Sequence, residues 1–304
     1  MKLIILSPNL HLVFTEDQKK YLEWEFEVEH FSTPTSLYSL MSLQSDAEKI
    51  VALDPDFCDW KVTQENLEKM KNVKAISLAT TSFHYIDIEY LKEKNIPLTN
   101  LRGFSTNAVA EQTFAMIFAL ARKLPMVLRE GCIVNFERYR WIELRWRKLW
   151  VIGLGRIWSR IAEIASGIGM NISYWSRNSR NAQYEYQALS ELLATSDVLV
   201  YALAKNDETE NLLSDTLLQN LNPKALFVSI AHIDHPKFIS LVQEGKIAGY
   251  ACDDRIWELW DFTWNILPWA ELGWCTDECF RRNGEQWIDS IMNAKKWNFP
   301  NQVS

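Results

Sequence analysis

The sequence has little of several features that mark particular classes of protein. Its five cysteines are an odd number without a zinc-type pair of pairs, which favours reduced thiols in the cytoplasm over a disulfide framework and predicts no metal site. The longest apolar helix candidate, 108–121, carries Glu111 and Gln112 and is too short to span a bilayer. A formal net charge of −7 without a basic stripe argues against nucleic acid as a partner. We therefore expect a soluble globular protein whose partner is not nucleic acid.

What the chain has instead is an alternation of short apolar runs with helical stretches. Its 304 residues suggest two domains, and the opening apolar run is short enough to predict a first strand rather than a signal peptide. Units of strand, helix and strand give parallel sheets, so we expect an α/β fold with two doubly wound parallel-sheet domains. The predicted strands are 3–6, 50–53, 75–78, 149–152, 172–175, 198–203, 225–230 and 249–252, and the predicted helices are 16–26, 64–70, 86–94, 108–121, 188–193, 215–221 and 236–243.

Residues 149–177 carry the most informative pattern. An apolar run ends at Gly153-Leu154-Gly155, and a helix with an apolar stripe is expected from Arg156. In a Gly-x-Gly-x-x-Gly fingerprint the first glycine makes the tight turn, the second lets backbone approach a pyrophosphate, and the third lets the helix pack closely on the strand. Trp158 stands at the third position, where an indole is expected to overpack that contact. The pattern predicts a dinucleotide site at the helix N-terminus, with a purely structural turn as the alternative.

Several segments together resemble the D-isomer-specific 2-hydroxyacid dehydrogenase family. They are the Gly153-Leu154-Gly155-Arg156-Ile157 turn and residues 100–111, 196–200, 244–249 and 273–278. The resemblance implies a dinucleotide-binding Rossmann domain, 100–284, inserted in a flavodoxin-like substrate domain, 1–99 plus 285–304. It also implies an oxidoreductase that moves a hydride between NAD(P)(H) and a small 2-keto or 2-hydroxy acid, and a homodimer. A catalytically silent dinucleotide-binding sensor or scaffold is the alternative.

The same resemblance implies three catalytic groups. The family uses an arginine that binds the substrate carboxylate, a histidine that donates a proton, and a glutamate that orients the histidine. This chain has His232 near the place of the arginine, Glu271 in place of the histidine, and Glu258 near the place of the glutamate. A protonated His232 would bind a carboxylate, and a partly desolvated Glu271 would act as an acid. Ordinary solvated surface residues are the alternative.

The resemblance further assigns cofactor and substrate contacts. At the end of the second strand an acidic side chain selects NAD, whereas an arginine accommodates the 2′-phosphate of NADP. The chain has Ser176, Arg177 and Arg180 there and no acid, which favours NADP(H) over a merely solvated loop. The expected cofactor-binding residues are Thr106, Gly153, Gly155, Arg156, Ile157, Ser176, Arg177, Arg180, Ala204, Ala231 and Asp253, and the expected substrate-binding residues are Thr80, Thr81 and Ser82.

Tryptophan is abundant where glycine is scarce. Fourteen tryptophans stand against ten glycines, although glycine ordinarily makes up about 7% of residues. We hypothesise that the source reads one codon, UGA, as glycine, so that several tryptophans of this sequence are glycines in the native protein. The alternative is a protein repacked around bulky side chains. The resemblance predicts glycine at Trp146, Trp150, Trp158 and Trp297, and also at Trp141, Trp264 and Trp269, whereas Trp24, Trp175, Trp274 and Trp287 stand at ordinary positions.

Overall fold

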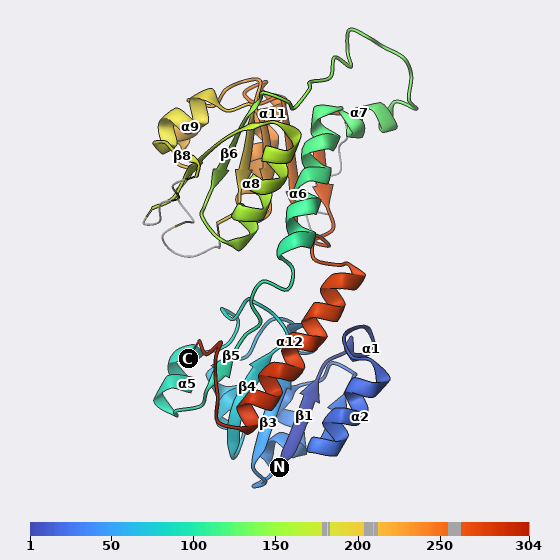
Figure 1. The fold of residues 1–304 in the computed structure, drawn as a ribbon, viewed down its shortest axis with the longest axis vertical. Coiled ribbons are helices and arrows are strands. Elements are labelled where there is room, and N and C mark those ends of the chain that lie inside the picture. The colour runs from blue at the N-terminus through green and yellow to red at the C-terminus, as the bar shows by residue number, and fades with distance from the viewer. Residues whose placement is uncertain (178–180, 182, 204–208, 210–211, 255–262, 304) are drawn as a thin grey trace. The chain divides into compact units, whose positions relative to one another are not determined.

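The chain forms two compact units. The computed structural model describes residues 1–303 apart from 178–180, 182, 204–208, 210–211 and 255–262. One unit comprises residues 1–105 and 276–304, and the other comprises 106–275. The expected domain boundary at 284/285 would fall inside α12 (Asp277–Lys295). The N-cap of this helix is Thr276, and the helix packs on the first sheet. The helix therefore stays whole within the first unit (Figure 1).

The first unit is built on a five-stranded parallel sheet in the order β2-β1-β3-β4-β5, which is the flavodoxin-like order. Helices cover both faces, so β1 and β3 are buried throughout their centres and read as continuous apolar runs. The strands are β1 (Lys2–Leu6), β2 (Glu27–Phe31), β3 (Lys49–Leu53), β4 (Val73–Leu78) and β5 (Leu98–Thr99). The other helices are α1 (Leu10–Val13), α2 (Glu16–Glu25), α3 (Met41–Gln44), α4 (Gln64–Glu68) and α5 (Ile88–Glu93), with 3-10 turns at Leu37–Ser39 and Pro55–Phe57.

The second unit is built on a seven-stranded parallel sheet in the order β12-β11-β10-β9-β6-β7-β8. Counted from β6, this is the Rossmann order with one added strand, and its switch point lies between β6 and β9. The predicted α/β class with two parallel sheets is confirmed. The strands are β6 (Lys148–Ile152), β7 (Asn171–Trp175), β8 (Glu185–Tyr186), β9 (Val198–Tyr201), β10 (Leu226–Ser229), β11 (Gly249–Asp253) and β12 (Ile266–Trp269). The helices are α6 (Thr106–Ala121), α7 (Leu124–Arg129), α8 (Arg156–Ile168), α9 (Leu189–Thr195), α10 (Asp215–Leu218) and α11 (His235–Gln243).

The second sheet separates two apolar cores. Leu149 and Val151 of β6 face the core formed with α6 and α8, whereas Trp150 and Ile152 face the core formed with α9, α10 and α11. Trp158 of α8 was expected to overpack the contact between α8 and the sheet. Instead its indole lies beside β7, with its ring edge-on to those of Tyr174 and Tyr184 at centroid distances of 5.2 and 5.4 Å. The indole and Tyr174 are buried, and Tyr184 is partly buried against the same core.

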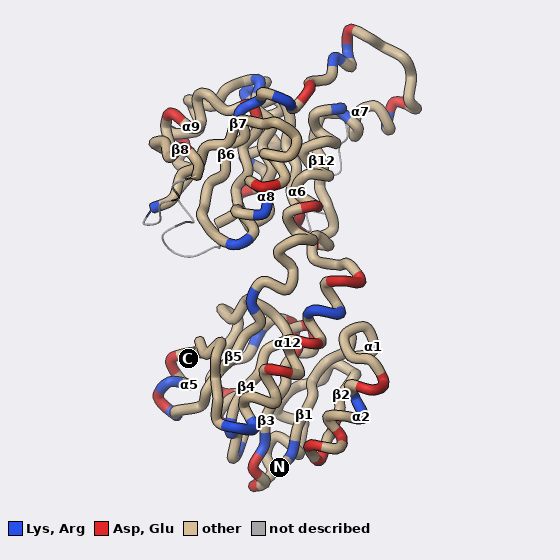
Figure 2. Tube along the Cα trace, in the orientation of Figure 1, with Lys and Arg blue, Asp and Glu red and all other residues tan. Residues whose placement is uncertain are grey.

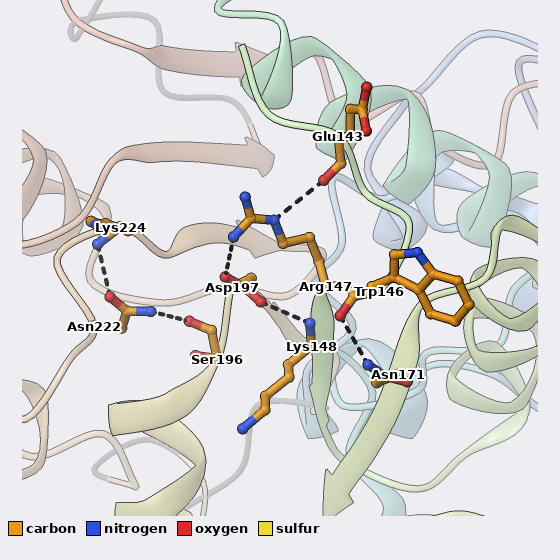
Figure 3. A network of polar contacts seen from close by, with 9 residues as sticks. All are labelled: Glu143, Trp146, Arg147, Lys148, Asn171, Ser196, Asp197, Asn222 and Lys224. Atoms are coloured by element: carbon orange, nitrogen blue, oxygen red, sulfur yellow. Dashed lines mark hydrogen bonds and ion pairs between the residues drawn. The ribbon is translucent and has the colours of Figure 1, made fainter. Parts of the chain in front are cut away.

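A polar network joins the amino-terminal ends of the central strands (Figure 3). The Asp197 carboxylate, just before β9, accepts hydrogen bonds from the Arg147 guanidinium at 3.1 Å and from the Lys148 backbone N–H at 2.9 Å. The Asn171 amide donates to the carbonyl oxygen of Trp146, and Asn222 donates to that of Ser196. These bonds hold the strand order at the edge opposite the switch-point crevice.

Charges of both signs are distributed over each unit. Figure 2 shows Lys and Arg residues interspersed with Asp and Glu residues along the chain of each unit. Among the described residues, no helix has the length and apolar character needed to cross a membrane.

Close packing of α12 depends on a glycine in its middle. A Cβ built at Gly284 would lie 2.1 Å from the carbonyl oxygen of Val13 in α1, so the two backbones touch. One turn further along, the indole of Trp287 donates to the carbonyl oxygen of Ser77 at 3.2 Å. The Ser290 hydroxyl hydrogen-bonds to the hydroxyls of Ser77 and Thr99, each at 2.8 Å. The glycine lets the helix come near enough to the sheet for these buried polar contacts to form.

We expect Gly284→Ala to destabilise the protein by about 1–3 kcal/mol, because the methyl group would push α12 from α1. The control is Gly167→Ala in α8, where a Cβ meets nothing within 4 Å and alanine should stabilise the helix by about 0.4–1 kcal/mol. Thermal and urea unfolding of both variants measure the effects. Equal stability of Gly284→Ala and the parent chain would contradict this role.

Candidate dinucleotide and keto-acid site

The turn between β6 and α8 has the backbone that a dinucleotide requires. Gly153 has φ +124°, and a Cβ there would lie 3.3 Å from the carbonyl oxygen of Ala202, which directly follows β9 across the switch point. Gly155 is the N-cap of α8, and a Cβ there would meet nothing within 4 Å. Arg156 and Ile157 form the first helical turn, whose N–H groups and dipole favour an anion. The turn therefore fits a pyrophosphate group.

The other expected cofactor residues in the second unit are spread around its sheet. Ser176 follows β7 and is buried, and Arg177 beside it is exposed. Ala231 follows β10, and its carbonyl oxygen accepts from the Ser229 hydroxyl at 2.6 Å. Thr106 begins α6. Arg180 and Ala204, which the sequence also assigned to the cofactor, lie outside the described residues.

Asp253, the last residue of β11, holds the loop that carries Glu271. Its carboxylate accepts hydrogen bonds from the backbone N–H of Leu272 at 3.1 Å and of Gly273 at 3.0 Å. Burial raises the pKa of the Asp253 carboxyl, and these backbone donors oppose the rise. A Cβ at Gly273 would lie 2.5 Å from the carboxylate, so glycine is needed for this contact. The sequence assigns Asp253 to the cofactor. In the structure its carboxylate fixes the loop backbone next to Glu271, a candidate catalytic residue.

Asp254, the next residue, contacts two histidines. Its Oδ2 lies 2.7 Å from Nδ1 of His232 and 2.7 Å from Nε2 of His235. The other ring nitrogen of His235 lies 2.6 Å from the hydroxyl of Tyr250. His232 was expected from the sequence, whereas His235, Asp254 and Tyr250 were not singled out. The alternation of polar residues in His232-Ile233-Asp234-His235 and the position of Asp254 beside Asp253 are the only sequence signals for them.

The remaining expected residues lie elsewhere. Thr80, Thr81 and Ser82 follow β4 in the first unit, where the Ser82 backbone N–H donates to the Thr80 hydroxyl at 3.4 Å. The Asn100 amide donates to the Thr81 carbonyl oxygen at 2.6 Å. Glu258 lies outside the described residues. Within the described part of the chain, no group of three or more His, Cys, Asp or Glu side chains has a metal-binding arrangement.

Residues 114–258 match the NAD binding domain of the D-isomer specific 2-hydroxyacid dehydrogenase family. A glyoxylate reductase of Aeropyrum pernix is 30% identical over 250 residues, which cover 76% of this chain and 72% of that protein. The chain belongs to the D-isomer specific 2-hydroxyacid dehydrogenase family. The predicted family and the predicted class of function, a nicotinamide-dependent oxidoreductase of this type, are therefore confirmed.

Other proteins are similar to this chain over most of their length. A hydroxyphenylpyruvate reductase of Plectranthus scutellarioides is 25% identical over 245 residues, covering 77% of each chain. Among solved structures, an acyclic imino acid reductase (Bsp5) in complex with NADPH and D-Arg has a TM-score of 0.86 at 24% identity, covering 100% of both chains. A glyoxylate reductase from Paecilomyes thermophila has a TM-score of 0.87 at 19% identity, covering 100% of this chain and 98% of the other. These two structures share the fold of this dehydrogenase.

We expect Gly155→Ala to weaken NAD(P)H binding by about tenfold or more, a loss of about 1.4 kcal/mol, while the unfolding temperature stays close to that of the parent chain. The methyl group has space in the protein but lies where backbone approaches the pyrophosphate. Fluorescence titration with NADH and NADPH measures the change. Gly153→Ala is the contrasting variant, since its φ of +124° makes alanine strained and should lower the unfolding temperature. Unchanged cofactor affinity in Gly155→Ala would contradict the assignment.

Proposed function

We propose that this dehydrogenase uses NADPH to reduce a small 2-keto acid to the 2-hydroxy acid, with His232 and Glu271 in the roles of the family's arginine and histidine. The observation that best supports this is the pair of aspartates at the end of β11. Asp253 hydrogen-bonds to the loop next to Glu271, and Asp254 hydrogen-bonds to His232. Both candidate groups are thereby anchored at one end of a strand in the nucleotide-binding sheet.

The proposed residues divide the chemistry between them. The bound nicotinamide supplies a hydride to the keto carbon. His232 in its imidazolium form binds the substrate carboxylate through one N–H contact, in place of the two-pronged contact of a guanidinium. Glu271 in its acid form donates a proton to the carbonyl oxygen, and solvent later returns a proton to the carboxylate. The hydroxy acid thus leaves with the hydride on carbon and the proton on oxygen.

The substrate is proposed to be small and carboxylated. The relatives include several glyoxylate reductases, so glyoxylate is the first compound to assay. The hydroxyls of Thr80, Thr81 and Ser82 are proposed to bind the substrate carboxylate. Because they replace a glycine-rich turn, they would supply hydroxyl donors where the family uses backbone N–H groups.

NADPH is proposed as the preferred cofactor. Ser176 and Arg177 follow β7, and the described residues at this strand end include no acid that would repel a 2′-phosphate. The guanidinium of Arg177 is exposed and suited to paired contacts with phosphate oxygens.

The cytoplasm is proposed as the location of the protein. The structure pairs none of the five cysteines in a disulfide, which fits a reducing compartment.

A homodimer formed through the second unit is also proposed. Figure 1 shows α7 and the segment after it extending away from the sheet of this unit. The segment exposes large apolar side chains, which on a monomer's surface mark a contact site. They are Leu128, Ile133, Val134, Phe136 and Trp141, with exposed fractions of 51–85%. A second copy of the chain is the proposed partner because the family resemblance implies dimerisation.

We expect slow reduction of glyoxylate, hydroxypyruvate or pyruvate, with a high KM and a higher kcat/KM for NADPH than for NADH. Glu271→Gln should lower kcat by about a hundredfold or more while sparing NADPH binding, since the amide cannot act as an acid. Arg177→Ala should weaken NADPH binding by about 10- to 100-fold and leave NADH nearly unchanged. Steady-state rates of NADPH consumption, and cofactor titrations, measure these effects.

Three outcomes would each overturn a part of the proposal. Full activity of Glu271→Gln would remove the proposed proton donor. Tight NADPH binding without reduction of any of these keto acids would favour a silent dinucleotide-binding sensor or scaffold. Equal losses for both cofactors in Arg177→Ala would reject the assignment of NADPH.

A further inference from the structure

A partly buried carboxylate contacts the exposed candidate histidine. The side chain of Asp254 is 15% exposed, that of His235 is 8% exposed, and that of His232 is 61% exposed. One oxygen of Asp254 contacts both rings, at 2.7 Å each. The contacts therefore run from the interior at Tyr250, through His235 and Asp254, to the surface at His232.

The donors and acceptors that these side chains offer set the direction of each hydrogen bond. An ionised carboxylate only accepts, so Nε2 of His235 and Nδ1 of His232 both donate to Asp254. Nδ1 of a neutral His235 then accepts from the Tyr250 hydroxyl at 2.6 Å. Burial raises the pKa of Tyr250 well above its usual range, which keeps that hydroxyl a donor. Tyr250 and His235 together hold the Asp254 carboxylate in one position.

We propose that Asp254 is a positioning residue that orients the His232 ring and compensates its positive charge, so that Nε2 of His232 binds the carboxylate of the keto-acid substrate. A guanidinium is charged in any surroundings, whereas an imidazole binds an anion well only when its proton is stabilised. The Asp254 oxygen is within hydrogen-bonding distance of Nδ1 and supplies that stabilisation. This inference rests on the proposed function and extends it to residues that do not touch the substrate.

The test compares the effect of Asp254→Asn on KM with its effect on kcat. Asp254→Asn should raise KM for glyoxylate by about 10- to 100-fold, with a smaller change in kcat and an unchanged Kd for NADPH. In a His232→Arg background the same substitution should have little effect on KM, because the guanidinium keeps its charge without Asp254. Asp215→Asn is the matched control, since that carboxylate is 85% exposed and pairs with Lys237. Equal effects of Asp254→Asn in both backgrounds, or an effect on kcat alone, would overturn the proposal.

A binding measurement tests the positioning role of Asp254 independently of the proposed reaction. Oxamate, an unreactive isostere of pyruvate, is titrated into the NADPH complex by calorimetry. If no keto acid is reduced but Asp254→Asn weakens oxamate about tenfold or more, the reaction is wrong and the positioning role stands. If Asp254→Asn does not fold, His232→Gln serves instead, because its site is exposed and it should weaken oxamate equally. Unchanged oxamate affinity in both variants would overturn the positioning role.

A second, independent inference concerns the tryptophans at positions where glycine is expected. Helix α11 ends in a turn in which Gly245, at φ +70°, donates from its N–H to the Val242 carbonyl at 3.1 Å. The next residue, Lys246, donates to the Leu241 carbonyl at 2.8 Å. This is a Schellman motif, whose left-handed residue is usually glycine.

Helix α12 ends in the same motif with an indole at the left-handed position. Trp297, at φ +55°, donates to the Ala294 carbonyl at 3.1 Å, and Asn298 donates to that of Asn293 at 3.0 Å. Trp146, which precedes β6, also has a left-handed backbone, with φ +67°. Left-handed backbone disfavours any residue with a Cβ, and an indole lacks the short polar side chain with which Asn or Asp bonds to the local backbone and offsets that cost.

Trp150 and Trp158 show a different mismatch. Both side chains are 1% exposed, and the structure gives neither indole N–H a hydrogen-bond partner among the described residues. Trp287, which stands at an ordinary position, is equally buried and donates to the Ser77 carbonyl. A buried tryptophan normally finds a partner for its N–H, because leaving the group unpaired costs stability.

We infer that the native chain carries glycine at positions 146, 150, 158 and 297, read from a single codon that this sequence renders as tryptophan. Peptide mass spectrometry of the protein from its native source should find glycine at these four positions and tryptophan at 175 and 287. Tryptophan at all fourteen positions would overturn the inference. In the recombinant chain, Trp297→Gly should raise the unfolding temperature, whereas Trp24→Gly, at an exposed position within α2, should lower it. A lower unfolding temperature for Trp297→Gly would also contradict the inference.

Discussion

The candidate site depends on the hydrogen bonds that two successive carboxylates make at the end of β11. Asp253 ends the strand and Asp254 directly follows it, and the two carboxylates contact different loops. Asp253 accepts from the backbone beside Glu271, and Asp254 accepts from His232 and His235. One strand end therefore positions both groups proposed for catalysis, and a shift of β11 would displace them together.

The proposed exchange of a guanidinium for an imidazole gives the polar contacts of this region a role. An arginine brings its own charge and a rigid fork of donors, whereas a histidine needs a partner to set its tautomer and its charge. The contacts of Asp254 with His235, and of His235 with Tyr250, supply that partner in a fixed place. Because the imidazole makes one contact where the guanidinium makes two, substrate binding is expected to be weaker than in the family's usual arrangement.

The tryptophans at positions 146, 150, 158 and 297 occupy places in the fold that do not suit their side chains. The strand orders are those of the flavodoxin-like and Rossmann folds, and a Cβ would be crowded at both Gly153 and Gly284. Trp297 and Trp146 adopt backbone angles that suit glycine, and Trp150 and Trp158 bury N–H groups without partners. Four of the tryptophans that the family resemblance places at glycine positions therefore show a local mismatch with the structure around them.

The sequence by itself determined the α/β class, the family and the glycine turn, because continuous apolar runs and short-range glycine spacing encode buried parallel strands and their turns. It did not predict β2, β8 or β12, since edge strands are short and partly exposed and lack such runs. It singled out His232 and Glu271 but not Asp254, His235 or Tyr250. Their contacts depend on the pairing of β10 with β11, which brings residues nineteen and twenty-two positions apart within hydrogen-bonding distance. Only the tertiary structure decides that proximity, because strand register is set by packing between distant segments rather than by local sequence.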